Sequence, residues 1–240
     1  MTEFELIMLI VFTFSIVQSI FGVGILVFGT PTCLLLGYPF EETISYLLPA
    51  SISISCMQIF HGKDEVKLKK EFLIFTIPFI ILGLTVVLVK WFSFDMKIPV
   101  GLMLILTGTV RLFPKIQNSM ERFLRKQMKF YLISMGFIHG LSNMGGGLLT
   151  ILSSSLFKKK KEVRANIAYG YLIFAMTQII VLSILKPSLF HLNIMVFPFI
   201  SLFTYICLGN IMFLKSNEKM YQSFITVFTL AYGIVLLFPT

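Results

Sequence analysis

FGVGILVFGTP (Phe21 to Pro31) and SNMGGGLLTIL (Ser142 to Leu152) are two glycine-containing stretches in otherwise apolar sequence. They lie about 120 positions apart in a chain of 240 residues, so one half of the chain reads as a diverged copy of the other. Each stretch predicts a place where one helix ends and the next begins, because glycine removes the side chain there.

Aligning the two stretches also pairs residues outside them. The paired positions are Gln18 with His139, Gly22 with Asn143, Gly24 with Gly145 and, after one deletion, Gln58 with Gln178 and Pro78 with Pro198. Broken helices at corresponding positions of two halves are the best sequence pointer to a midplane binding site in a transporter. The pattern therefore favours a duplicated membrane transporter.

The composition is that of an integral membrane protein. The chain is 57% hydrophobic and 13% charged, with a mean hydropathy of +0.91, more apolar surface than a soluble domain of this length can bury. The first residues, Met-Thr-Glu-Phe-Glu, are acidic where a secretory signal is basic, so we expect no cleaved signal and a first helix that stays in the membrane.

Charge and hydropathy divide the chain into apolar segments and connecting loops. The segments span residues 6–21, 23–38, 43–60, 72–89, 98–113, 129–142, 144–157, 165–185, 192–214 and 220–238. We expect all Asp, Glu, Lys and Arg residues to lie in the loops or at segment ends, because a charged side chain at bilayer depth is costly. The sequence predicts an all-α, polytopic membrane protein.

Basic residues gather on one predicted face. With the N-terminus outside, four loops (61–71, 111–129, 158–164 and 215–219) share a face and carry 17 of the 20 Lys and Arg residues. The positive-inside rule makes that face cytoplasmic and both termini periplasmic or extracellular. Topology therefore explains the net charge of +9 without nucleic acid. Trp91, beside Lys90, predicts an anchor at the outer interface.

The same assignment predicts two inverted repeats. Residues 1–114 form the first, 115–128 a cytoplasmic linker and 129–240 the second, and each repeat consists of a short helical pair around a glycine break plus three transmembrane helices. Segments 129–142 and 144–157 are each about 21 Å long as helices, short of a hydrocarbon core of about 30 Å. Their lengths favour a hairpin that turns inside the membrane, although two tilted spans would place the charges equally well.

The glycine breaks carry the strongest functional signal. Backbone N–H groups freed at the start of the second helix can face an anion, assisted by the helix dipole. Non-helical backbone is tolerated at membrane depth only when it is buried in protein or lines a cavity. Close helix packing is the alternative explanation, since small residues also permit it. The duplication, beside polar residues, favours a site.

The two breaks resemble the GxGGGxxxxP-like pattern of the sulfite exporter TauE/SafE family of membrane transporters, and the resemblance covers essentially the whole chain. The first copy, Gly22 to Pro31, retains the outer glycine pair and the proline, with Ile25 and Leu26 replacing two glycines. The second retains the triple glycine, with Asn143 in place of the first glycine and Leu152 in place of the proline. The resemblance implies export or exchange of small anions, notably sulfite and organosulfonates, across the bacterial inner membrane.

Polar residues beside the breaks complete the predicted site. His139 can bind an anion when protonated or relay a proton, or it can be a neutral hydrogen-bonded histidine between helices. Gln58 and Gln178 either donate hydrogen bonds into a central cavity or tie helices together. The expected substrate-binding residues are Gln18, Ser19, Gly22, Gly24, Gln58, His139, Ser142, Asn143, Gly145, Gly146, Gly147 and Gln178.

No catalytic residue, metal site or cofactor is expected. Three dispersed His residues without buried carboxylates make a poor enzyme site, and Cys33, Cys56 and Cys207 lack metal-binding or CxxC spacing. The expected partners are a small anionic substrate, membrane lipid and a coupling proton carried by His139 or by the substrate. The alternatives are a drug/metabolite-type transporter of another small solute and a membrane accessory protein that transports nothing. The sequence leaves the oligomeric state open.

Overall fold

The structure is a computed structural model that describes residues 2–68, 70–89 and 97–237. Every regular element in these residues is helical, which confirms the predicted all-α class. The predicted interface anchor, Trp91 with Lys90, lies outside the described residues.

The helices follow the predicted apolar segments. They are α1 (Glu3–Phe21), α2 (Thr30–Leu35), α3 (Phe40–Gly62), α4 (Lys70–Leu88), α5 (Lys97–Leu112), α6 (Pro114–Ser142), α7 (Gly145–Leu156), α8 (Lys160–Leu185), α9 (Val196–Thr204), α10 (Asn210–Lys215) and α11 (Glu218–Leu237). A π-helical turn, Ile25–Gly29, leads into α2, and a second, Tyr205–Gly209, joins α9 to α10. Short 3-10 turns cover Lys63–Glu65, Pro187–Leu189 and Leu192–Met195.

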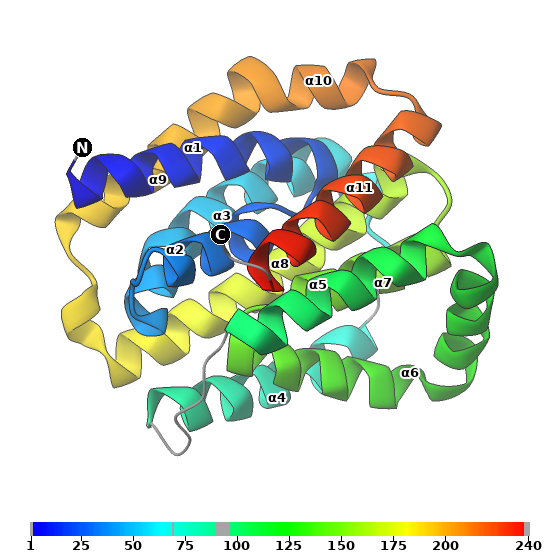
Figure 1. Ribbon diagram of the computed structural model, residues 1–240, viewed down its shortest axis with the longest axis horizontal. Coiled ribbons are helices and arrows are strands. Elements are labelled where there is room, and N and C mark those ends of the chain that lie inside the picture. The colour runs from blue at the N-terminus through cyan, green and yellow to red at the C-terminus, as the bar shows by residue number, and fades with distance from the viewer. Residues whose placement is uncertain (1, 69, 90–96, 238–240) are drawn as a thin grey trace.

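Five helical segments of the described chain are long and apolar enough to cross a membrane. They are Glu3–Phe21, Phe40–Glu65, Lys70–Leu88, Lys160–Leu185 and Leu192–Lys215. The chain is therefore a multi-pass membrane protein. Helices α3 and α8 pack together in the middle of the molecule, with α1 and α9 along one edge and α4 and α6 along the other (Figure 1).

The stretch expected as a linker is helical. Helix α6 begins at Pro114 and continues to the second break, with non-helical backbone angles only at Gln127. Its first half is amphipathic: Met120, Leu124 and Met128, spaced four residues apart, are partly or fully buried, while their neighbours face outward. Twelve-residue α7 is about 18 Å long, too short to span a bilayer alone.

Small residues let α4 and α6 touch backbone to backbone. A Cβ atom added at Gly83, Gly136 or Gly140 would lie 2.4–2.5 Å from a backbone oxygen of the other helix, which no side chain can occupy. Close approach through small residues is the usual way membrane helices associate. This contact fixes the end of α6, and with it the second break, against α4.

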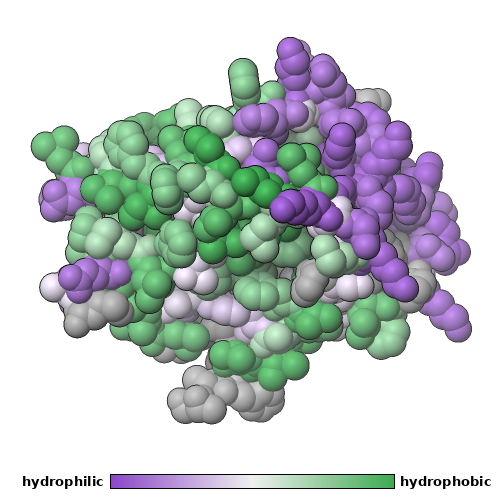
Figure 2. Space-filling view, turned by 90° about the horizontal axis from the view of Figure 1, so that it is seen from above, coloured by the Kyte–Doolittle hydropathy of each residue, from purple (hydrophilic) through white to green (hydrophobic). Residues whose placement is uncertain are grey.

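The surface separates into an apolar body and a charged end. Figure 2 shows hydrophilic side chains gathered at one end of the molecule, where α6 begins and where α7 connects to α8 and α10 to α11. The rest of that face is largely apolar. Large apolar residues that are exposed on the described chain include Ile184, Phe199 and Phe203. Exposed apolar surface on this scale suits a protein surrounded by lipid.

Candidate functional site

Both predicted breaks are helix ends with a left-handed residue. Helix α1 stops at Phe21, and Gly22 has φ 79° and donates its N–H to the Gln18 carbonyl oxygen at 2.8 Å. Helix α6 stops at Ser142, and Asn143 has φ 62° and donates its N–H to the His139 carbonyl oxygen, also at 2.8 Å. The residues that the alignment pairs thus make the same backbone contact at each break.

At the first break, the Gln18 side chain bridges the gap. Its Oε1 accepts the Ile25 N–H at 3.1 Å, and its Nε2 donates to the Ser51 carbonyl oxygen at 3.1 Å. The expected free N–H at Ile25 is therefore already paired in this structure. A Cβ atom on Gly24 would lie 2.4 Å from the backbone nitrogen of Gln18. The backbone at Gly24 can therefore pass this close to α1 only because the residue is glycine.

A glutamine from the next helix caps each break. Gln58 on α3 donates from Nε2 to two carbonyl oxygens in the last turn of α1, those of Gln18 at 2.7 Å and Ser19 at 3.1 Å. Gln178 on α8 contacts His139 in the same way: its Nε2 lies 3.5 Å from the His139 carbonyl oxygen. The two glutamines that the alignment pairs therefore act at both breaks as ties between helices.

His139 is buried and paired with Gln178. Its Nε2 lies 3.0 Å from Gln178 Oε1, and its ring lies 4.1 Å, centroid to centroid, from that of Phe174. Because the Gln178 amide nitrogen faces the His139 carbonyl, Gln178 Oε1 accepts a hydrogen from Nε2. His139 Nδ1 then carries a lone pair and has no partner among the described residues.

Asn143 connects the second break to the helix that follows the first. Its Nδ2 donates to Thr30 Oγ1 at 2.7 Å, and both residues are fully buried. Neighbouring Ser142 acts locally, since its hydroxyl donates to the Ile138 carbonyl and accepts the Met144 N–H. Of the predicted site residues, Asn143 is therefore the one that joins the two broken segments directly.

The triple glycine is packed on all sides. Added Cβ atoms would lie 2.4 Å from His139 Cβ at Gly145, 1.6 Å from the Tyr171 hydroxyl at Gly146 and 2.5 Å from Thr107 Oγ1 at Gly147. These glycines allow α7 to begin where α6, α8 and α5 converge. Close packing thus requires them whether or not they also contact a substrate.

Buried polar atoms without a protein partner surround the breaks. Within the described residues these include Ser19 Oγ, Gln58 Oε1, His139 Nδ1, Asn143 Oδ1 and Tyr171 Oη. Such atoms are rare in folded proteins, because each costs the desolvation of a polar group. Their position beside both breaks is the feature expected of a place that receives a polar occupant.

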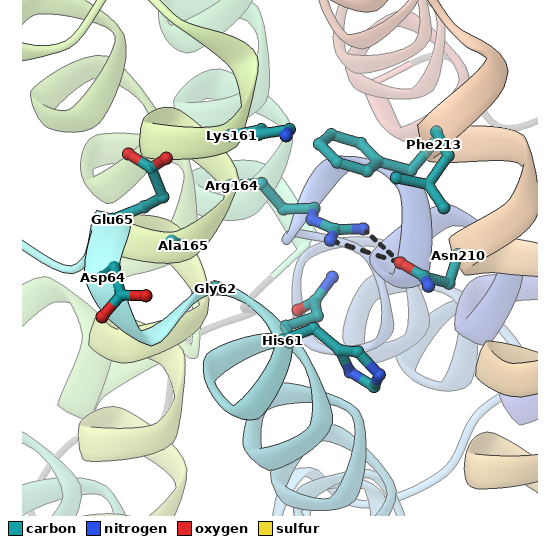
Figure 3. A pocket seen from close by; sticks show the side chains of 11 residues that line it. His61, Gly62, Asp64, Glu65, Lys161, Arg164, Ala165, Asn210 and Phe213 are labelled. Atoms are coloured by element: carbon teal, nitrogen blue, oxygen red, sulfur yellow. Dashed lines mark hydrogen bonds between the residues drawn. The ribbon is translucent and has the colours of Figure 1, made fainter.

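A cavity of about 260 Å³ opens at the charged end, beside the first break (Figure 3). Its walls come from the end of α3, the turn after it, the start of α8 and α10. The lining residues are Gln58, His61, Gly62, Asp64, Glu65, Lys161, Arg164, Ala165, Asn210, Phe213 and Leu214. Gln58 places one of the predicted site residues in this wall.

The turn after α3 is held against α8. Asn166 Oδ1 accepts the backbone N–H groups of Lys67 at 2.7 Å and Leu68 at 2.8 Å, and Lys67 Nζ lies 2.5 Å from Glu162 Oε1. This hydrogen bond to Glu162 raises the pKa of Lys67 above its usual value. These contacts fix one wall of the cavity.

Arg164 is the charged residue deepest in the cavity wall, and the sequence analysis assigned it to a loop. Only 7% of the residue is exposed. Its Nη1 donates to the Ser19 carbonyl oxygen at 3.2 Å, both terminal nitrogens lie 3.3 Å from Asn210 Oδ1, and its Cζ lies 3.4 Å from the Phe213 ring centroid. No ion pair joins it to a described residue.

One sequence signal could have identified Arg164. It precedes Tyr171 and Gln178 by seven and fourteen residues, so the three lie on one face of α8, and all are buried. Grouping Arg164 with the preceding lysine run concealed this spacing.

Comparison with known proteins agrees with this geometry. Residues 7–238 match the family described as Sulfite exporter TauE/SafE. No curated protein and no solved structure matches the chain. Since the match covers nearly the whole chain and includes both breaks, the chain belongs to the sulfite exporter TauE/SafE family of membrane transporters.

Proposed function

We propose that this protein is a secondary transporter that moves a small sulfur-containing oxoanion, sulfite or an organosulfonate, across the bacterial inner membrane by alternating access. Family membership supports the substrate class. The observation that carries the proposal is the pair of buried breaks, which the Asn143–Thr30 hydrogen bond joins. Of the unpartnered atoms beside them, the Ser19 and Tyr171 hydroxyls can donate to an anion, whereas Gln58 Oε1, Asn143 Oδ1 and His139 Nδ1 accept hydrogen bonds from a protonated group or water.

The two halves, residues 1–114 and 129–240, are proposed to be inverted repeats on either side of a linker at 115–128. The matched contacts support this: the residue pairs Gly22/Asn143, Gln18/His139 and Gln58/Gln178 have corresponding backbone or side-chain partners. Inverted repeats supply the two halves that rock against each other in many transporters. The Lys/Arg-rich end is proposed as cytoplasmic, with both termini outside.

The proposed binding region comprises the breaks and the twelve predicted polar and glycine residues. Several of their side chains are paired with other protein groups in this structure, such as Gln18 with Ser51 and Asn143 with Thr30. Substrate binding then requires some of these pairs to open, which ties binding to a change in conformation. Proton coupling, if present, uses His139 or the titration of sulfite itself, which changes protonation near neutral pH.

Counterflow in proteoliposomes tests this function. Purified protein is reconstituted with unlabelled sulfite inside, labelled sulfite is added outside, and thiosulfate, sulfoacetate, sulfate and a neutral solute are added as competitors. The proposal predicts saturable sulfite accumulation that related sulfur anions inhibit and the neutral solute does not. Inhibition by the neutral solute alone would favour a metabolite transporter, and no exchange by folded protein would favour an accessory role.

A further inference from the structure

Arg164 is a buried cation that faces neutral groups. Its contacts are the Ser19 carbonyl, the Asn210 side chain and the Phe213 ring, and the Tyr205 hydroxyl lies beside it. A desolvated charge is costly unless a counter-ion compensates it, and dipoles and an aromatic face do so only in part. Arg164 therefore has the contacts of an anion-binding residue, and no carboxylate of the described chain forms an ion pair with it.

The Arg164 guanidinium has N–H donors that its protein contacts do not use. It carries five N–H groups in a planar fork that suits the paired oxygens of an oxoanion, and its contacts with Ser19, Asn210 and Tyr205 do not use all of them. Ser19 O also accepts a hydrogen bond from Gln58 at 3.1 Å. Arg164 can thus turn toward an anion without leaving that carbonyl unpaired.

The cavity has an inner and an outer part. Figure 3 shows the Arg164 guanidinium directed toward Asn210, while the carboxylates of Asp64 and Glu65 lie on the other side of the cavity. Asp64 and Lys161 are exposed, so water screens their charges. The volume of about 260 Å³ is below the roughly 300–1,000 Å³ of sites for drug-sized ligands, which suits a small ion with bound water.

We propose that Arg164 binds the oxoanion group of the transported substrate at the Lys/Arg-rich mouth of the transport path, directly beside the first break. This inference rests on the proposed function and adds a residue to it. Arg164 touches the substrate head group, and its contact with Ser19 links the bound anion to the end of α1. Sulfite and organosulfonates share the oxygens that such a fork recognises.

The test compares Arg164→Gln, Arg164→Lys and the control Lys159→Gln, which removes a positive charge from the same basic end, at an exposed residue outside the cavity lining. Counterflow of labelled sulfite gives KM and Vmax for each variant. We expect Arg164→Gln to raise KM at least about tenfold, because a charge-assisted hydrogen bond is lost. Arg164→Lys is expected to raise KM less, since it keeps the charge without the fork. Lys159→Gln is expected to keep KM within about twofold of the wild-type value.

The KM and Vmax values separate binding from folding. A purely structural role would lower Vmax with the amount of folded protein and leave KM unchanged, which would contradict the inference. If Arg164→Gln aggregates in size-exclusion chromatography, Arg164→Lys decides: a raised KM supports the anion site, and wild-type values overturn it.

A binding measurement distinguishes failure of this inference from failure of the proposed function. Calorimetric titration of detergent-solubilised protein with sulfite should show binding in wild type and a large loss in Arg164→Gln. Wild-type binding that Arg164→Gln retains would refute the role of Arg164 even if counterflow succeeds. Binding that depends on Arg164 in a protein without counterflow would uphold the site and refute transport. No binding by folded wild-type protein would overturn the site.

Discussion

Asn143 serves the second break through both its backbone and its side chain. The left-handed backbone is costly for most residues but tolerated by glycine and asparagine. The amide donates to Thr30 and keeps one oxygen without a described partner. These roles can be separated, because glycine preserves the backbone and alanine preserves neither.

Melting temperatures of Asn143→Gly and Asn143→Ala should therefore differ. We expect Asn143→Ala to be the less stable by about 1–2 kcal/mol, the usual cost of a left-handed backbone for a residue with a Cβ. Thr30→Val and Asn143→Gly should be non-additive by roughly 0.5–1.5 kcal/mol, because each removes the same hydrogen bond. Strict additivity in a double-mutant cycle would show that this bond contributes nothing.

At the scale of elements, the start of α7 is constrained by its neighbours. Gly146→Ala would place a methyl group where the Tyr171 hydroxyl lies, so the buried Tyr171 side chain or its helix must shift. We expect a loss of about 1–3 kcal/mol, typical of overpacking. Gly62→Ala is the control, since its Cβ would lie 3.4 Å from Ala165 Cβ, an ordinary contact. Equal thermal stability of the two variants would contradict the observed packing.

This packing changes how glycine substitutions should be interpreted. Loss of transport in Gly146→Ala would follow from distortion alone, so it cannot show that the glycine binds substrate. Variants that remove a polar group without adding volume, such as Asn143→Gly and Thr30→Val, carry that information.

The order of helices and breaks could be predicted from sequence because apolar runs, charged ends and glycine positions are local features. Gln18, Gln58, His139 and Gln178 also lie beside the breaks, where the alignment of the two stretches puts them; that they bind substrate stays a prediction. Two features were not predicted: the helical first half of α6 and the burial of Arg164. Each depends on which helices become neighbours, and one sequence does not contain that information.

At the scale of the whole molecule, the charged end defines an orientation that labelling can test. In a cysteine-free background, Lys159→Cys at the basic end and His191→Cys, an exposed residue outside the Lys/Arg-rich loops, are treated with a membrane-impermeant maleimide. The positive-inside rule predicts labelling of His191→Cys in intact cells and of Lys159→Cys only after the membrane is opened. The reverse pattern would contradict the proposed topology.

The central claim of the proposed function is that two halves enclose one anion between their breaks. The Asn143–Thr30 hydrogen bond joins the second break to the segment that follows the first. The most direct test is the initial rate of labelled sulfite counterflow in wild type and Asn143→Gly, both verified as folded and equally reconstituted. We predict saturable exchange by the wild type and a rate at least about tenfold lower in the variant, because the Asn143 amide that donates to Thr30 is then no longer available to donate to the anion. Wild-type exchange rates in Asn143→Gly would show that the second break does not bind the substrate.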